Sequence, residues 1–381
     1  MKKILFFATI PASIKEFSLD YMQFLKSKSY EVEAAAGVAH QTEYVRSQGF
    51  KCYDFEIPRG IDPLGDWKAF RAIYKIIKQG NYDVVHTQTA KAGFIGRVAA
   101  KLNKVPLIIH TAHAWPFHPF LSKPLKFYYL FLEKFCAKLC DNIIVDTKTV
   151  RDYGLQNKVT KTTKIKQIYM GIDTEKFHPL EQTEKQKLRN DLNISQDKIV
   201  IGSISRLVED KGIEILIACA EKLKDKDNVL FLHLGEGPLR SQFKKQIKTA
   251  GVEHMFKLLG YKNDVLPFYN IFDIYCLPTK REGFGVVFAE ALACEVPVIA
   301  SDIAPLNNEI IVNGETGLLC KEKDVDRFTE AISKLFDPNL RQKLGQNGRK
   351  YIYQNFNINK TNQQTLDHYR HLWQTKFKEN F

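Results

Sequence analysis

Short apolar runs alternate with longer amphipathic segments along the whole chain. In the first half the apolar runs predict strands at Ile4–Thr9, Glu31–Ala36, Val84–Thr87, Leu107–Thr111, Asn142–Asp146 and Lys166–Tyr169. Helical periodicity between them predicts helices at Phe17–Ser27, Gln41–Gln48, Asp66–Gln79, from Lys91 onward, and from Pro124 to Cys140. This alternation is typical of parallel sheets joined by crossover helices.

The pattern restarts after a junction, which contains Gly171-Ile172-Asp173, Phe177-His178-Pro179 and a charged helix over Leu180–Asn193. Further strands are predicted at Ile199–Ile204, Val229–Leu234, Phe256–Leu259, Ile274–Leu277, Val296–Ala300 and Gly317–Leu319. Helices are predicted at Ile213–Lys224, Pro238–Ala250, from Gly285 onward, and in the tail at Val325–Phe336, Asn339–Gln354 and Ile358–Phe377. We therefore expect an α/β protein with two doubly wound, Rossmann-like domains, one formed by residues 1–178 with the C-terminal helix 358–381 and one by residues 179–357.

The length and the N-terminus agree with this architecture. A chain of 381 residues exceeds the usual size of one hydrophobic core. Met1-Lys2-Lys3 before an apolar run imitates a signal peptide, but a buried first strand has the same pattern and is favoured because Lys15-Glu16 follow closely. No apolar stretch reaches the roughly 18 residues that span a bilayer, so no transmembrane helix is expected.

Positive charge is concentrated in the first half of the chain. Residues 1–175 carry +10 of the net charge of +13. A basic face attracts nucleic acid, anionic lipid or a phosphorylated small molecule. Between Trp115 and Cys140 aromatic residues interleave with lysines, which suits the surface of a membrane, although a core-facing helix with solvated lysines has the same pattern. Since no nucleic-acid-binding motif is present, we expect no nucleic-acid partner.

The cysteines indicate neither a disulfide scaffold nor a metal site. The seven cysteines are scattered and contain no Cys-x-x-Cys pair. Cys136 and Cys140 share a helical spacing, but no second pair lies nearby to complete a zinc site. Reduced thiols are the simplest interpretation.

The segment Arg281–Ala291 carries the strongest chemical signal. It follows a predicted strand and contains Glu282, two glycines, a helix start and Glu290. The glycines allow close backbone approach, and free N–H groups at the helix start favour an anion such as a diphosphate. Glu282 can accept hydrogen bonds from sugar hydroxyls and Glu290 from a ribose diol. The alternative is that Glu282 only complements the helix dipole and Glu290 lies on the surface, but the apolar neighbours of Glu290 make an unpartnered carboxylate costly.

These residues resemble the signature of glycosyltransferase family 4, which comprises retaining, nucleotide-sugar-dependent enzymes of GT-B architecture. The segment Ser205–Gly212 is similar to the family's Gly-Arg-Leu-x-x-x-Lys-Gly element, with Ser205 in place of the glycine. Further matching segments are Gly171-Ile172-Asp173, Gly235-Glu236-Gly237-Pro238, Gly260-Tyr261, and Asn313-Gly314-Glu315-Thr316-Gly317-Leu318-Leu319. The resemblance covers nearly the whole chain.

The resemblance implies a donor site in the second domain. Arg206 and Lys211 would bind the diphosphate, Glu290 the ribose and Glu282 the sugar, with Glu282 also counted as catalytic. A planar guanidinium and a point charge together suit a diphosphate, although a solvated charge cluster remains the alternative. The other donor-binding candidates are Gly235, Tyr261, Gly283, Phe284, Gly285 and Val286. No cofactor and no metal ion are implied, because these cations and the helix start would stabilise the leaving diphosphate.

In the first domain, His113 follows a strand and matches the family's catalytic cleft histidine. His110 lies within the strand and is expected to be packed in the core; that both histidines are structural stays an alternative. Ser13, Thr87 and Lys91 are candidate acceptor contacts, since the segment from His86 to Gly93 resembles a subgroup that builds lipid-linked capsular polysaccharide, exopolysaccharide or O-antigen units. The loop from Ile10 to Ser13 departs from the family by lacking paired glycines.

The resemblance therefore implies an active site in the cleft between the domains of a retaining, metal-independent hexosyltransferase. We expect transfer of a hexose or N-acetylhexosamine from a nucleotide sugar, most simply a UDP sugar, to a polyprenyl-diphosphate-linked glycan. The enzyme would be cytoplasmic and peripheral on the inner membrane surface. The alternatives are a non-catalytic membrane-binding protein with the same fold and a sugar-nucleotide epimerase. Loss of sugar transfer in Glu282→Ala would separate an enzyme from a membrane-binding protein.

Overall fold

The computed structural model describes residues 2–38, 41–58, 60–117 and 121–381. The chain forms two compact units, Met1–Met170 with Asn359–Phe381, and Gly171–Ile358. Residues 171–178, which the sequence assigned to the first domain, lie in the second unit. Two hydrogen bonds attach them to this unit. The N–H of Ile172 donates to the carbonyl of Phe356 at 2.6 Å, and the side chain of Asn270 donates to the carbonyl of His178 at 3.1 Å.

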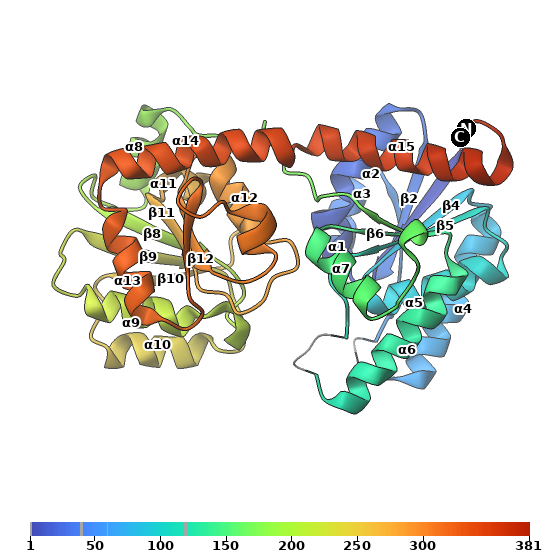
Figure 1. The fold of residues 1–381 in the computed structure, drawn as a ribbon, viewed down its shortest axis with the longest axis horizontal. Coiled ribbons are helices and arrows are strands. Elements are labelled where there is room, and N and C mark those ends of the chain that lie inside the picture. Colours follow the sequence, from blue (N-terminus) through green and yellow to red (C-terminus); the bar gives the residue numbers. More distant parts are fainter. Residues whose placement is uncertain (1, 39–40, 59, 118–120) are drawn as a thin grey trace. The chain divides into compact units, whose positions relative to one another are not determined.

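The first unit is built on a parallel sheet with the strand order β3-β2-β1-β4-β5-β6-β7 (Figure 1). The strands are β1 Lys3–Phe7, β2 Glu31–Gly37, β3 Lys51–Phe55, β4 Val84–Gln88, β5 Leu107–Ala112, β6 Asn142–Val145 and β7 Ile165–Gln167. Strand β3 was not predicted. It lies at the edge of the sheet and mixes exposed and half-buried residues, so it lacks the apolar run that marks the inner strands.

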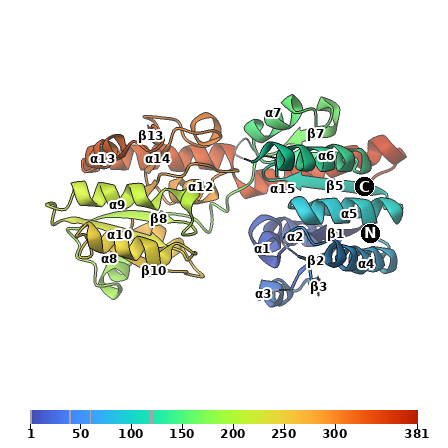
Figure 2. The same ribbon diagram turned by 90° about the horizontal axis from the view of Figure 1, so that it is seen from below.

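Helices cover both faces of this sheet (Figure 2). One face packs against α4 Pro63–Gly80, α5 Ala90–Leu102 and α6 Lys123–Leu139. The other packs against α1 Pro11–Phe17, α2 Leu19–Ser27, α3 Gln41–Ser47 and α15 Ile358–Phe377. The remaining helical segments of this unit are α7 Lys148–Gln156 and the short η1 Thr162–Lys164. The single helix predicted at Phe17–Ser27 is instead two helices that meet at Ser18.

The C-terminal helix α15 is anchored in the core of the first unit. The hydroxyl of Tyr369 lies 2.5 Å from Nδ1 of His86, and Nε2 of His86 lies 2.7 Å from the hydroxyl of Thr111. Burial lowers the pKa of His86 to about 3. The imidazole is therefore neutral at physiological pH, and it bridges α15 to the two central strands β4 and β5.

The second unit contains a parallel sheet with the order β10-β9-β8-β11-β12-β13. Its strands are β8 Ile199–Ile204, β9 Val229–Leu234, β10 Phe256–Gly260, β11 Ile274–Leu277, β12 Val298–Ser301 and β13 Gly317–Cys320. Its helices are α8 Gln182–Asp191, α9 Ile213–Lys222, α10 Arg240–Thr249, α11 Leu266–Ile271, α12 Val286–Ala293, α13 Val325–Lys334 and α14 Pro338–Asn355, with the short η2 Glu209–Lys211 and η3 Leu306–Ile310. The predicted fold class of two doubly wound α/β domains is confirmed.

Two further sequence expectations concern membranes and thiols. Across the described ranges, every helix falls short of the length or the apolar character that crossing a bilayer requires. All seven cysteines are buried and unpaired, and burial raises the pKa of the Cys52 and Cys219 thiols to about 11. These thiols are therefore protonated and pack as small apolar groups.

Candidate active site

The predicted donor residues follow the carboxyl ends of neighbouring strands in the second unit. Arg206 and Lys211 follow β8, Gly235 follows β9, Tyr261 follows β10 and Glu282 follows β11. The order β10-β9-β8-β11 makes these strands neighbours in a parallel sheet. Their loops therefore gather at one edge of the sheet, where open α/β sheets bind ligands.

Close backbone packing fixes these loops. A Cβ on Gly235, whose φ is +134°, would lie 1.9 Å from the carbonyl oxygen of Ser205. A Cβ on Gly212, whose φ is +68°, would lie 2.0 Å from the carbonyl oxygen of Pro278. Only glycine fits at either position without moving the backbone. The loops after β8, β9 and β11 thus hold one another in place.

Lys211 and Glu282 form an ion pair in the middle of this edge. Nζ of Lys211 lies 2.7 Å from Oε1 of Glu282, and the two side chains are only 16% and 12% exposed. Arg206 is exposed, and no residue that the structure describes forms an ion pair with it. A diphosphate bound here would find the Arg206 guanidinium open and would compete with Glu282 for the Lys211 ammonium.

Glu290 lies on α12 and is held by a tyrosine that sequence reasoning missed. The buried hydroxyl of Tyr269, on α11, donates to Oε2 of Glu290 at 2.7 Å. Burial, reinforced by the Glu290 charge, raises the pKa of Tyr269 well above its usual value, so the hydroxyl stays protonated as a donor. Glu290 is therefore neither a free surface residue nor an unpartnered buried carboxylate.

The start of α12 presents its backbone rather than an aromatic ring. Gly283 lies in the loop between β11 and α12, and Gly285, with φ +87°, precedes Val286, the first helical residue. The ring of Phe284 is buried and packs edge-on against Phe356 with centroids 5.5 Å apart. The first N–H groups of a helix have no partner within it, so the main chain around Val286 can bind an anion.

In the first unit, His113 follows β5 and is oriented by an acidic residue. Nδ1 of His113 lies 2.6 Å from Oδ2 of Asp146, which follows the neighbouring strand β6. Nε2 lies 3.4 Å from Oε1 of Gln88, and the ring packs against Phe17 with centroids 4.2 Å apart. With Nδ1 directed at the carboxylate, Nε2 is the ring nitrogen that faces away from Asp146. Asp146 was not singled out from the sequence, because the predicted strand extended through Asp146, whereas β6 ends at Val145.

Thr87 is placed in the core rather than at a binding surface. Its hydroxyl is fully buried and lies 3.0 Å from Nδ1 of His110 on the adjacent strand. Burial lowers the pKa of His110 well below its usual value, as expected for a packed, neutral histidine. We therefore remove Thr87 from the candidate acceptor contacts.

Ser13 and Lys91 line one cavity of the first unit. This cavity has a volume of about 400 Å³ and lies among the starts of α1, α4 and α5 and one side of α6. Nζ of Lys91 lies 2.6 Å from Oδ1 of Asp66 and also donates to the carbonyl of Gly60. Two of the three predicted acceptor residues are thus brought together, with the charge of Lys91 already paired.

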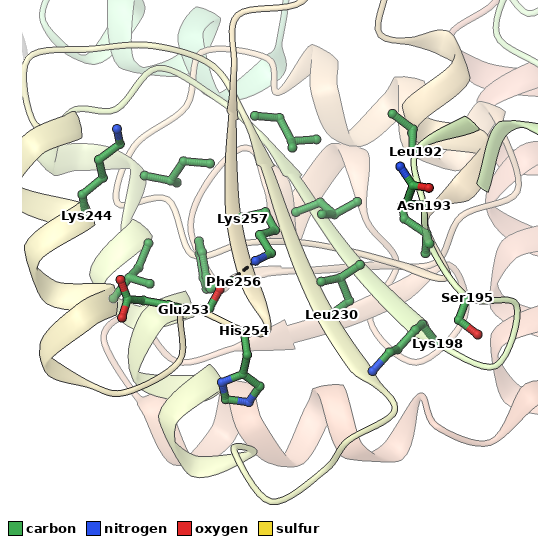
Figure 3. Close-up of a pocket in the computed structure, with 15 residues that line it drawn as sticks. Leu192, Asn193, Ser195, Lys198, Leu230, Lys244, Glu253, His254, Phe256 and Lys257 are labelled. Carbon is green, nitrogen blue, oxygen red and sulfur yellow. Dashed lines mark hydrogen bonds between the residues drawn. The ribbon is translucent and has the colours of Figure 1, made fainter. Parts of the chain in front are cut away.

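A larger cavity in the second unit lies apart from the donor residues (Figure 3). It has a volume of about 690 Å³ and is lined by the residues before β8 and by β9, β10 and α10, including Lys198, Lys244 and Lys257. None of the predicted donor residues lines it. In the part of the chain that the structure describes, no cluster of three or more His, Cys, Asp or Glu side chains is arranged to hold a metal ion.

Comparisons with known proteins agree with this arrangement. Residues 19–176 match the family described as Glycosyltransferase Family 4, and residues 184–351 match Glycosyl transferases group 1. A putative glycosyltransferase, EpsD of Bacillus subtilis, is 31% identical, over 92% of this chain and 91% of the relative. The UDP-Gal:α-D-GlcNAc-diphosphoundecaprenol α-1,3-galactosyltransferase of Escherichia coli is 27% identical, over 91% and 90% of the two chains.

The crystal structure of Anabaena HepE in complex with UDP and glucose superposes with a TM-score of 0.83 at 20% identity, covering 97% of this chain and 99% of HepE. Together with the two parallel α/β units, this likeness defines the fold as GT-B. The chain belongs to glycosyltransferase family 4.

Proposed function

We propose that this glycosyltransferase is a retaining enzyme that moves a hexose or N-acetylhexosamine from a UDP sugar to a polyprenyl-diphosphate-linked glycan. The observation that carries the proposal is the cationic, glycine-rich strand edge around Lys211 and Glu282, which suits a sugar diphosphate. The acceptor class is supported by relatives. The Escherichia coli relative is named for a UDP-galactose donor and a diphosphoundecaprenol acceptor. A Campylobacter jejuni relative, 29% identical over 91% of this chain and 92% of its own, is named as a diphospho-undecaprenol N-acetylgalactosaminyltransferase.

In this proposal the donor residues have two tasks: the cations and the helix start stabilise charge on the leaving UDP, and the two glutamates bind hydroxyl groups. Arg206, Lys211 and the N–H groups at the start of α12 bind the diphosphate, whose negative charge grows as the glycosidic bond breaks. Glu290 accepts from the ribose hydroxyls, and Glu282 from the transferred sugar. Retention follows from attack on the same face that the leaving group departs from. The acceptor hydroxyl then gives its proton to the departing phosphate oxygen, so no side-chain nucleophile is needed.

In this mechanism His113, a residue of the first domain, contacts the donor sugar. Asp146 fixes its Nδ1, so Nε2 is oriented to contact the donor sugar near the reacting carbon. The acceptor is proposed to bind the first domain through the cavity that contains Ser13 and Lys91. In this proposal the second domain binds the donor, and the first domain binds the acceptor and contributes His113 to the donor sugar.

A transfer assay tests the proposed function. Purified enzyme is incubated in EDTA with labelled UDP-glucose, UDP-galactose, UDP-N-acetylglucosamine or UDP-N-acetylgalactosamine and an undecaprenyl-diphosphate-linked saccharide. We expect one of these donors to label the lipid fraction, with the anomeric configuration of the donor kept in the product. Transfer from a GDP sugar alone, or an inverted product, would contradict the proposal.

Tyr269 is predicted to position Glu290 for the ribose. In Tyr269→Phe the carboxylate loses the hydrogen bond from this hydroxyl, so UDP should bind about tenfold more weakly, and the higher affinity for UDP than for 2′,3′-dideoxy-UDP should largely disappear. Calorimetric titration with both nucleotides measures the effect. Tyr275→Phe is the matched control, because Tyr275 is equally buried but donates to the carbonyl of Ile204 at 3.1 Å. Equal loss of ribose discrimination in both variants would show that Tyr269 is only structural.

We propose further that the enzyme is peripheral on the cytoplasmic face of a membrane, attached through the first domain. The support is the surface of α6, where Phe127 is 72% and Phe131 is 60% exposed, with Tyr128 and Phe135 also exposed. Exposed aromatic side chains of this number on one helix are unusual for a protein surface. Lysines of the same helix, including Lys126 and Lys134, complement anionic headgroups.

The double variant Phe127→Ser/Phe131→Ser is predicted to weaken membrane attachment. Flotation with phosphatidylglycerol vesicles should show a partition constant reduced about tenfold or more. The reason is that the variant lacks the two aromatic side chains that would insert into the bilayer interface. The control is Tyr353→Ser, which removes an exposed aromatic residue from α14 in the second unit. If the double variant floats as the wild type does, α6 is not the attachment surface.

A further inference from the structure

The cavity of the first unit is lined largely by apolar side chains. Helix α5 packs between α4 and α6 (Figure 1), and the cavity lies where the starts of α4 and α5 meet α6. Phe94 and Ile95 of α5 face Tyr128, Tyr129 and Leu132 of α6 across it. Apart from the tyrosine hydroxyls, these side chains offer a ligand only carbon surface.

The charged groups at the cavity are already neutralised. Lys91 is paired with Asp66, and both line the cavity. Glu133, which lines the opposite wall, is paired with the fully buried Arg97, whose Nη2 lies 2.9 Å from Oε2 of Glu133. Because each of these cations has its carboxylate, the described residues that line the cavity leave no excess positive charge to attract an anion.

The hydroxyls of Thr9 and Thr89 at the polar end are also partnered, and Ser13 adds a third hydroxyl to the wall. The hydroxyls of Thr9 and Thr89 lie 2.7 Å apart, and the N–H of Ala92 donates to Oγ1 of Thr9 at 3.2 Å. A polar ligand would have to displace these hydrogen bonds, whereas an apolar ligand would leave them intact. The chemistry of the cavity therefore favours an uncharged hydrocarbon.

The cavity opens beside the exposed aromatic surface of α6. Tyr128 both lines the cavity and is exposed, and Ile61, which lines it from the α4 side, is 67% exposed. Phe127 and Phe131 are exposed on the same helix, so a chain leaving the cavity would meet apolar surface rather than open water. The cavity and the exposed aromatic surface of α6 are therefore suited to a ligand that extends from a bilayer into the protein.

We propose that this cavity binds the isoprene units of the lipid acceptor that lie next to its diphosphate. The proposal rests on the proposed function for the existence of a polyprenyl acceptor and adds where, and through which part, the acceptor is recognised. With about 30 Å³ for each carbon-sized group, a five-carbon unit fills roughly 150 Å³. A volume of about 400 Å³ then holds about two or three units. The diphosphate and the glycan would lie outside the cavity.

Calorimetry with prenyl diphosphates of one to four isoprene units tests this assignment. The full-length protein is first saturated with UDP, so that the donor site cannot bind the diphosphate of the probe. We expect the Kd to fall about fivefold or more for each unit up to the second or third, because each unit buries apolar surface, and then to level off. An affinity that does not depend on chain length in the wild type would overturn the assignment.

Three variants locate the effect. Leu132→Trp fills the cavity and should abolish the dependence on chain length, while Phe94→Ala enlarges it and should move the plateau to one unit more. Phe135→Ala, an exposed aromatic position on α6 that does not line the cavity, should match the wild type. If Leu132→Trp keeps the wild-type dependence while Phe135→Ala loses it, the chain binds the outer surface of α6 and the assignment is wrong.

The assignment and the proposed function fail in distinguishable ways. One possible result is sugar transfer to undecaprenyl-diphosphate-linked saccharide together with prenyl binding that does not depend on chain length. This result would overturn only the assignment of the cavity to the isoprene units. Chain-length-dependent binding without transfer from any UDP sugar would overturn the proposed function instead.

Discussion

Replacing Glu282 with glutamine is expected to lower sugar transfer about a hundredfold to a thousandfold while UDP binds at least as tightly as before. The carboxylate that would hold the sugar hydroxyls is lost, and with it a contact that strengthens in the transition state. Lys211, however, is released from the 2.7 Å ion pair and becomes free for the diphosphate. We expect the Kd for UDP to improve about threefold, measured by calorimetry beside steady-state transfer rates.

Glu214→Gln provides the matched control for this variant. Glu214 also pairs with a lysine of the neighbouring loop, since Nζ of Lys280 lies 3.0 Å from Oε1 of Glu214, but it is not among the predicted donor residues. Both transfer and UDP binding should stay within about twofold of the wild type. If Glu282→Gln weakened UDP binding as much as it weakened transfer, the ion pair would be a structural element of the diphosphate site rather than a sugar contact.

His113→Ala should reduce kcat about a hundredfold or more with little change in the KM for the donor. The imidazole is proposed to act near the reacting carbon, so its loss affects the transition state more than the ground state. Asp146→Asn should cost about tenfold, because Nδ1 of His113 loses the carboxylate 2.6 Å away while the ring stays packed on Phe17.

Two readouts separate catalysis from structure at this histidine. Thermal unfolding of both variants should stay close to the wild type, since the His113 ring is only half-buried and asparagine keeps the shape of the buried Asp146 side chain. A loss of kcat that is equal in His113→Ala and Asp146→Asn would assign the effect to the carboxylate itself. A kcat close to the wild-type value in His113→Ala would remove His113 from the mechanism.

The inner strands of both sheets could be predicted from the sequence because helices bury both of their faces, which makes each strand a continuous apolar run. Strand β3 escaped prediction because, at the edge of the sheet, Lys51 and Asp54 interrupt that run. The end of the first domain was placed too late because the bond from Ile172 to Phe356 joins residues far apart in the sequence.

The candidate site was predictable in position but not in pairing. Loops after strands meet at one edge of a parallel sheet, so Lys211 and Glu282 could be assigned to one site from their order alone. That they pair with each other, or that Tyr269 holds Glu290, depends on side-chain geometry between separate elements. Thr87 was misassigned because β4 continues to Gln88, which leaves Thr87 inside the strand opposite His110.

We propose that the second domain binds a uridine diphosphate through Lys211 without a metal ion. Calorimetric titration with UDP and with GDP, both in excess EDTA, tests it most directly when repeated on Lys211→Ala and on the control Lys280→Ala. We expect that UDP binds to the wild type and to Lys280→Ala, that it binds better than GDP, and that Lys211→Ala loses at least about tenfold in affinity. Binding of UDP that needs a metal ion, that survives in Lys211→Ala, or that is weaker than binding of GDP would contradict it.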